Sequence, residues 1–321
     1  MPIDTLYPTP PLLRTHALSV GDGHVLQVQE YGAADGIAAA VLHGGPGSGS
    51  SPLLRRFFDP ARYRAICIDQ RGAGASRPEG ATEHNTTADL LEDLRRVREH
   101  LGLAHWLVVG GSWGATLAVA HAAVEPEAVA GLLLRASFLA RREDIEWFFQ
   151  GAATEQPHAW QRFAAAAPVA SRDALLPWFA TTLASGEPGP CAAAALAWWQ
   201  WEQTLASGAV PGTQPSGDAL AALVARYRIQ SHYLLHDCWL TTPTLLERCE
   251  AVPPVPTLLL HGDADRVCRP EGARALARRL PRARLQWIAG AGHDPLHPGM
   301  ASAMVAALDR FAAQGDFVGP A

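Results

Sequence analysis

Short apolar runs alternate with amphipathic stretches along most of the chain. The runs typical of β-strands lie at 24–30, 38–42, 63–68, 106–109, 129–134, 257–260 and 285–288. Apolar residues at helical spacing predict a helix over 90–101, which Thr86 or Thr87 can cap and Gly102 can end. We expect further helices after the strand at 106–109 and from about 271 and 299. Such alternation indicates an α/β fold, with a mostly parallel sheet between two layers of helices.

The pattern changes between about 137 and 240. This segment is rich in alanine, holds seven of the ten tryptophans and offers no convincing strand. Glycine and proline interrupt it at 186–190 and 211–217, which predicts several helical pieces. We therefore expect a core domain made of 1–136 and 241–321, with 137–240 inserted as a helical cap domain. A separate helical domain packed elsewhere is the alternative.

Composition narrows the function classes. The 321 residues are 48% hydrophobic and 18% charged, as in a globular protein, and the net charge of −5 comes without a basic block that would bind nucleic acid. No apolar stretch approaches the roughly 20 residues of a membrane span, and Met1 to Thr5 show no secretory pattern. Five scattered cysteines give no metal-binding spacing. We expect a cytoplasmic protein without metal, membrane or nucleic-acid partner, and nothing predicts an oligomeric state.

A glycine-flanked serine directly follows the strand at 106–109. Gly110-Gly-Ser-Trp-Gly114 leads straight into a helix-forming stretch, which is the nucleophile-elbow pattern of α/β-hydrolases. Ser112 would sit on a strained turn where side chains on Gly110 and Gly114 would crowd the backbone. The sequence therefore predicts Ser112 as a nucleophile at a helix N-terminus.

A serine nucleophile needs a base and an acid, which in this fold follow it along the chain. His293 ends a glycine-rich loop after the strand at 285–288, so it is the candidate base. Asp263 and Asp265 both lie in the loop after the strand at 257–260, and either could reach the imidazole. We favour Asp265, with Asp263 as a turn former that bonds backbone amides, and interpret Asp294 as a solvated or loop-capping carboxylate.

The segment His43-Gly-Gly-Pro-Gly47 follows the strand at 38–42. Its glycines let backbone amides approach a substrate oxygen, so the N–H groups of Gly45 and Trp113 should form an oxyanion hole. A simple glycine–proline turn is the alternative for this segment. We interpret His43 as a structural hydrogen-bonding residue and not a second base.

Five segments together resemble the proline iminopeptidase (prolyl aminopeptidase) family. They are His43 to Gly47, Asp69-Gln-Arg-Gly-Ala-Gly-Ala-Ser76, Gly110 to Ala118, Trp198-Trp-Gln-Trp-Glu202 and Gly290-Ala-Gly-His293. The similarity runs over nearly the whole chain. It implies a triad of Ser112, Asp265 and His293, and cleavage of N-terminal proline from peptides through an acyl-enzyme without a cofactor.

The same resemblance implies the substrate-binding residues. Glu202 matches the family's amine-binding glutamate, Phe138 and Phe148 match its apolar proline pocket, and Cys268 matches a cysteine close to the site. Taken alone, the glutamate could be an exposed helix charge, the phenylalanines plain core, and the cysteine a buried spectator.

One departure from the family concerns the cap. Arg228-Ile-Gln-Ser-His-Tyr233 puts Gln230 where the family usually has a glutamate that acts as a second amine anchor. A neutral amide removes one negative charge, so the affinity for an amine should fall, and Phe148 replaces the family's tyrosine. We expect a small peptide or amino-acyl substrate. A serine esterase or amidase with altered cap specificity is the alternative, and a non-catalytic binding protein is a third hypothesis.

Overall fold

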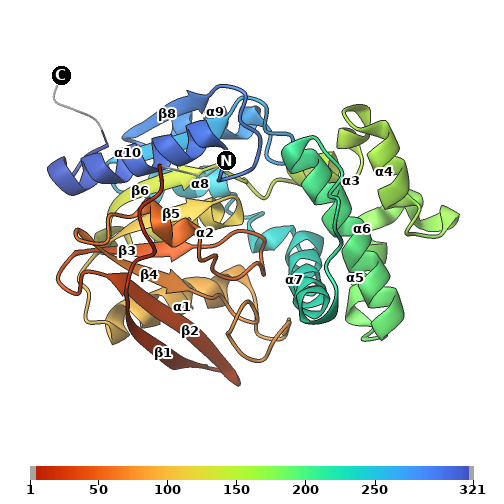
Figure 1. Ribbon diagram of the computed structural model, residues 1–321, viewed down its shortest axis with the longest axis horizontal. Coiled ribbons are helices and arrows are strands. Elements are labelled where there is room, and N and C mark those ends of the chain that lie inside the picture. The colour runs from red at the N-terminus through yellow and green to blue at the C-terminus, as the bar shows by residue number, and fades with distance from the viewer. Residues whose placement is uncertain (1–4, 318–321) are drawn as a thin grey trace.

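In the computed structural model, which describes residues 5–317, an eight-stranded sheet runs in the order β1-β2-β4-β3-β5-β6-β7-β8 (Figure 1). The strands are β1 (Leu12–Gly21), β2 (His24–Gly32), β3 (Ile37–Leu42), β4 (Tyr63–Ile68), β5 (Trp106–Gly111), β6 (Val129–Arg135), β7 (Thr257–Gly262) and β8 (Ala283–Ile288). β1 and β2 pair antiparallel, as do β2 and β4, whereas all pairs from β4 to β8 are parallel. The predicted α/β fold class is confirmed.

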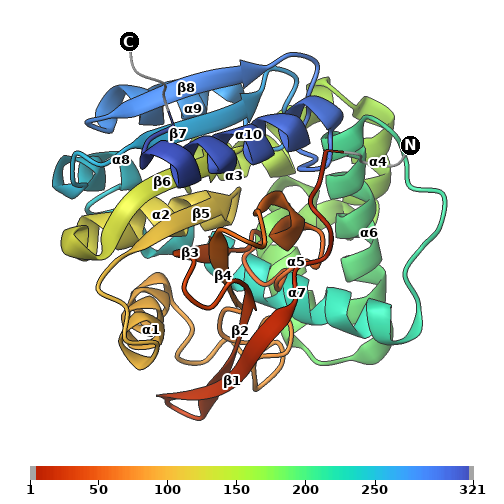
Figure 2. The ribbon, with the colours of Figure 1, turned by 60° about the vertical axis from the view of Figure 1, so that its left-hand side comes forward.

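Both faces of the central strands are buried, which explains their continuous apolar sequences. In β5, Trp106 and Val108 belong to one hydrophobic cluster, whereas Leu107 and Val109 belong to the other. This alternation follows the two-residue period of a strand. Helices α1 (Thr87–His100), α2 (Trp113–Val124), α8 (Leu245–Arg248) and α9 (Pro270–Arg279) contribute to the first cluster, and α10 (Pro298–Gln314) contributes to the second (Figure 2).

The first strand of the sheet was not predicted. The sequence analysis begins the sheet at His24, but β1 precedes it and forms a hairpin with β2 through the Gly21-Asp-Gly23 turn. Most side chains of β1 are exposed on this sheet edge, so no apolar run marks it. The prediction for α1 is confirmed: Thr86 caps it by a reciprocal hydrogen-bond pair with Asp89, and it is followed by Gly102 at φ +65°.

Of the α-helices between β6 and β7, the first five gather beside the sheet (Figure 1). They are α3 (Arg142–Phe149), α4 (Pro157–Ala164), α5 (Leu175–Ala184), α6 (Pro188–Ser207) and α7 (Gly217–Leu235). Aromatic rings fill the space between them, and the Phe163 ring stacks on Phe179 and Trp201 with centroids 4.8 and 5.7 Å apart. The aromatic residues of this segment thus form a core for the inserted helices.

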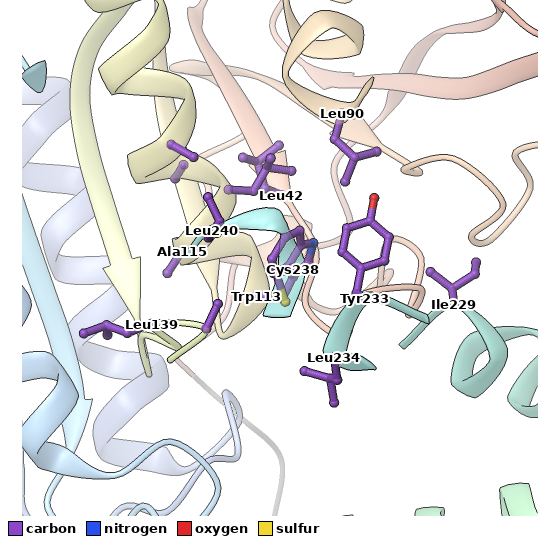
Figure 3. Close-up of a cluster of buried hydrophobic side chains, with 14 of the residues drawn as sticks. Leu42, Leu90, Trp113, Ala115, Leu139, Ile229, Tyr233, Leu234, Cys238 and Leu240 are labelled. Atoms are coloured by element: carbon purple, nitrogen blue, oxygen red, sulfur yellow. The ribbon is translucent and has the colours of Figure 1, made fainter. Parts of the chain in front are cut away.

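An apolar seam joins α7 to the sheet domain (Figure 3). Trp113, at the start of α2, meets Tyr233 of α7 edge to face, with ring centroids 5.1 Å apart. Both rings are fully buried, and the Tyr233 hydroxyl donates a hydrogen bond to Asn85 Oδ1 at 2.8 Å. The inserted helices therefore pack directly on the first residue of the helix that follows Ser112.

Candidate active site

Ser112 sits between β5 and α2 in a strained backbone conformation, with φ +56° and ψ −122°. A Cβ on Gly110 would come within 2.2 Å of the Gly114 carbonyl oxygen, and a Cβ on Gly114 would come within 2.1 Å of the Leu42 carbonyl oxygen. Neither position can hold a larger residue without moving the backbone. The strain is thus held by the close packing of two glycines, as expected for a nucleophile elbow.

His293 and Asp265 meet at the same edge of the sheet. His293 Nδ1–H donates to Asp265 Oδ2 at 2.8 Å, and Asp265 Oδ1 accepts the backbone N–H groups of Val267 and Cys268 at 2.9 Å each. Burial raises the pKa of Asp265, but the charge and hydrogen bond of His293 and the charge of His261 outweigh this effect, so the pKa lies below its usual value. Asp265 is therefore ionised and fixed in place, and it orients the His293 ring with Nδ1 towards the carboxylate.

The two other carboxylates near His293 have structural partners. Asp263 Oδ1 accepts the backbone N–H of Gly290 at 2.8 Å and so ties the loop after β7 to the loop after β8. Asp294 Oδ1 accepts the N–H of Leu296 at 2.9 Å within its own loop. Of the two candidate acids, the structure brings Asp265 to the imidazole and not Asp263.

The Ser112 hydroxyl faces a buried thiol. Within residues 5–317, the side-chain hydrogen-bond contact of Ser112 Oγ is Cys268 Sγ, at 3.9 Å. Ser112, Cys268 and His293 all line one cavity, which is described below. Burial raises the pKa of Cys268 well above its usual value, so the thiol stays neutral. Within residues 5–317 no hydrogen bond joins Ser112 Oγ to His293, and such bonds are often long or poorly aligned without substrate.

The two amides expected to form the oxyanion hole lie on adjacent segments. Within the described part of the chain, neither Gly45 N–H nor Trp113 N–H donates to a hydrogen-bond acceptor. Gly44 and Gly45 line the same cavity as Ser112, and Gly45 has φ +112°, which favours glycine. Both N–H groups thus lack a protein acceptor among the described residues, as donors of an oxyanion hole should.

A buried glutamine that the sequence analysis missed connects these two segments. Gln70 Oε1 accepts Trp113 Nε1–H at 2.9 Å, and Gln70 Nε2 donates to the His43 carbonyl at 3.0 Å. Its backbone N–H also donates to His43 Nε2 at 3.1 Å, while His43 Nδ1–H donates to the Gly44 carbonyl at 2.9 Å. Burial lowers the pKa of His43, so this histidine is a neutral structural residue, as expected. The position of Gln70 directly after β4 was the available signal.

A cavity of about 290 Å³ opens over Ser112. Its wall includes Phe138, Phe148 and Glu202, which the family resemblance implied for substrate binding, and also Gln230, where the sequence departs from the family. Phe148 also packs against Trp198 and Trp201, with centroids 6.0 and 6.3 Å away, so its ring belongs to both the aromatic core and the cavity wall. The helices between β6 and β7 thus supply one side of the cavity and the sheet loops supply the other.

Two arginines that the sequence analysis did not single out also line the cavity. Arg135, at the end of β6, donates from Nη1 to the His293 carbonyl at 2.8 Å, and burial lowers its pKa. Arg226 of α7 donates from Nη2 to Glu202 Oε1 at 2.5 Å, and the Tyr227 hydroxyl donates to Glu202 Oε2 at 2.7 Å. Neither arginine lies in a recognisable motif, so only the tertiary structure reveals them.

Three further properties concern residues 5–317. No group of three or more histidine, cysteine or acidic side chains within this range is arranged to hold a metal ion. Every helix in the same range is too short or too polar to form a transmembrane segment. All five cysteines are buried and free of disulfide bonds.

Comparison with known proteins identifies the family. A family model described as alpha/beta hydrolase fold matches residues 41–299. The probable proline iminopeptidase of Leptolyngbya boryana is 37% identical over 96% of this chain and 97% of its own length. The proline iminopeptidase of Xanthomonas citri is 39% identical over 96% of this chain and 99% of its own length. The structure of the Mycobacterium smegmatis proline iminopeptidase, 21% identical over 94% of this chain and 99% of that one, has the same fold, with a TM-score of 0.62. The chain belongs to the proline iminopeptidase family of the alpha/beta hydrolase fold.

Proposed function

We propose that the protein is a serine aminopeptidase that releases N-terminal proline, or a similar small residue, from short peptides without a cofactor. The observation that carries the proposal is the partly buried Asp265–His293 hydrogen bond of 2.8 Å beside a serine on a strained elbow. Relatives that share 37–39% of their sequence over nearly the whole chain and are named proline iminopeptidases support the same conclusion.

The reaction begins with the serine hydroxyl. Ser112 Oγ rotates towards His293, gives its proton to Nε2 and attacks the carbonyl carbon that follows the N-terminal residue. Asp265 holds the Nδ1 proton and stabilises the imidazolium that forms. The amides of Gly45 and Trp113 donate to the developing oxyanion, and one such donor typically contributes about 2.7–4 kcal/mol to transition-state stabilisation.

The second half of the reaction reverses these proton movements. His293 protonates the nitrogen of the departing peptide, which leaves the first residue esterified to Ser112. Water then gives a proton to His293 and attacks the ester carbonyl, and His293 passes that proton to Ser112 Oγ as the ester bond breaks and the free N-terminal amino acid leaves. Glu202 lies in the cavity wall as the partner for the substrate amine, and Phe138 and Phe148 supply apolar surface for a small ring.

The proposal is tested with a chromogenic prolyl anilide and its N-acetylated counterpart. We expect turnover of the free prolyl anilide and none of the blocked one, because an acetyl group removes the N–H of the ring nitrogen and adds volume beside it. The variant Ser112→Ala should abolish turnover while remaining folded. Equal rates on both anilides would refute recognition of a free N-terminus.

One observation favours a second candidate, a serine esterase or amidase of the same fold. Gln230 is neutral, and both oxygens of Glu202 already accept hydrogen bonds from protein side chains. A panel of small esters separates the candidates, because an esterase would turn them over much faster than any amino-acyl anilide. The Gln230→Glu variant should raise prolyl activity if the aminopeptidase proposal is correct.

The remaining parts of the proposal concern organisation. We assign 137–240 as a cap domain that selects the substrate, and 1–136 with 241–321 as the catalytic domain. The support is that α6 and α7 contribute Glu202 and Gln230 to the cavity over Ser112. The five free cysteines support a reducing cytoplasmic location.

A further inference from the structure

The cavity over Ser112 already contains a cation beside its amine-binding carboxylate. Arg226 and Glu202 face each other from neighbouring helices, and their side chains are 22% and 14% exposed. Glu202 Oε1 accepts Arg226 Nη2–H at 2.5 Å and Oε2 accepts the Tyr227 hydroxyl at 2.7 Å. Each oxygen of the carboxylate therefore has a donor before any substrate arrives.

The cavity wall as a whole carries balanced charge. Within the described residues, two carboxylates line it, Asp144 and Glu202, and so do two guanidinium groups, Arg135 and Arg226. Asp144 is held by Arg141 at 2.7 Å. An incoming ammonium ion thus meets no unpaired negative charge.

Gln230 does not restore that charge. Its side chain lines the cavity, the residue is 7% exposed, and Oε1 has no hydrogen-bond partner among the described residues. A neutral amide oxygen can accept one hydrogen bond, but a hydrogen bond to a neutral acceptor is about half as strong as one to a charged group. The wall can accept an N–H group without requiring that it be charged.

We propose that Arg226 is a specificity-determining residue. Because it neutralises the charge of Glu202, it broadens the range of acyl groups that the pocket accepts, from an N-terminal residue with a charged amine to small uncharged ring or branched acyl groups. The inference rests on the proposed function, because it concerns the acyl pocket of the same serine. A substrate cation has to share Glu202 with the Arg226 guanidinium, which repels it and so weakens its binding. An uncharged ring of the same shape is not repelled and loses no binding free energy in this way.

The test compares two anilides of equal shape. Prolyl 4-nitroanilide carries the ring nitrogen, and cyclopentanecarbonyl 4-nitroanilide replaces it by carbon. We expect wild-type kcat/KM for the two to differ by less than about tenfold. In Arg226→Met, Glu202 is released and the preference for the prolyl compound should rise at least tenfold, which is the size of a hydrogen bond to a charged group. Adding Glu202→Gln to this variant should return the preference to the wild-type value.

Arg228 provides the matched control. It lies on the same helix, donates to the Leu183 carbonyl at 2.9 Å and is not part of the cavity wall. Arg228→Met should leave the ratio of the two substrates unchanged. Arg226→Gln is the second variant if the methionine variant fails to fold, and labelling of Ser112 by a fluorophosphonate counts the folded active centres in each preparation.

The outcomes separate this inference from the proposed function. An unchanged or lower prolyl preference in both Arg226 variants would overturn the inference, as would a wild-type preference above about hundredfold. A wild type that cleaves the prolyl, cyclopentanecarbonyl and N-acetylprolyl anilides at similar rates, with the prolyl preference rising in Arg226→Met, would support the inference and refute the aminopeptidase proposal.

Discussion

Gln70 offers a way to disturb the oxyanion hole without touching either of its donors. The substitution Gln70→Leu removes the acceptor for Trp113 Nε1–H and the donor to the His43 carbonyl. Each buried group left without a partner costs about 1–3 kcal/mol, so the free energy of unfolding should fall by about 2–6 kcal/mol. A typical domain has about 5–15 kcal/mol to lose, so the variant should remain folded at low temperature.

The effect on catalysis follows from the same contacts. Loss of a whole oxyanion donor costs about 2.7–4 kcal/mol, and a donor that is displaced but present should cost less. We expect kcat on prolyl 4-nitroanilide to fall about 10- to 100-fold, which corresponds to about 1.4–2.7 kcal/mol, with KM nearly unchanged. Gln70→Glu keeps the acceptor for Trp113 and should give an intermediate kcat.

Thr87→Val is the matched control for stability. It removes the buried hydrogen bond from Thr87 Oγ1 to the Cys238 carbonyl (2.6 Å) without altering the shape of the side chain. Urea denaturation should show a loss of stability, while kcat stays at the wild-type value. If Gln70→Leu is folded and its kcat is within twofold of the wild type, the role assigned to Gln70 is wrong.

Three further predictions concern the elbow, the acid and a buried histidine. Gly114→Ala should lower the free energy of unfolding by more than about 3 kcal/mol because its Cβ would lie 2.1 Å from the Leu42 carbonyl oxygen, whereas Gly212→Ala, in open space, should change it by less than about 0.5 kcal/mol in urea denaturation. Asp265→Asn should lower kcat by a factor on the order of 10⁴ with little change in KM, and a loss below tenfold would exclude Asp265 as the acid. Burial lowers the pKa of His121 to about 4, so below its usual value of about 6.5 the unfolded chain binds the extra proton and stability falls as the pH drops. The free energy of unfolding should therefore fall between pH 7.5 and pH 5, and this fall should be about 2 kcal/mol smaller in His121→Gln than in the wild type. An equal fall in both proteins would show that His121 is not the group responsible.

Local sequence patterns were sufficient to predict the parallel strands and the tight turn at Ser112. The apolar runs of β3 to β7 are recognisable because both faces of each strand are largely buried. The glycines at 110 and 114 are recognisable because the backbone passes too close to them for any Cβ. These are short-range constraints, so they leave a direct trace in neighbouring residues.

Contacts between distant residues left no such trace. The partner of Glu202 lies 24 positions away on the next helix, and Gln70 reaches His43 and Trp113 from a third segment. β1 was missed because an exposed edge strand has no apolar face to reveal it. The family resemblance supplied Glu202 and Phe148 as cavity residues, but their surroundings depend on how α6 and α7 pack, which periodicity does not specify.

The contact between Trp113 and Tyr233 links the proposed cap domain to the proposed oxyanion hole. The residue whose amide we propose as an oxyanion donor is also the residue whose ring packs against α7. A chimaera that imports foreign α7 helices to gain new selectivity would therefore shift the electrophilic site as well. Successful grafts will be those that preserve an aromatic ring at position 233, and random diversification of α7 should yield fewer active clones around that position than elsewhere on the helix.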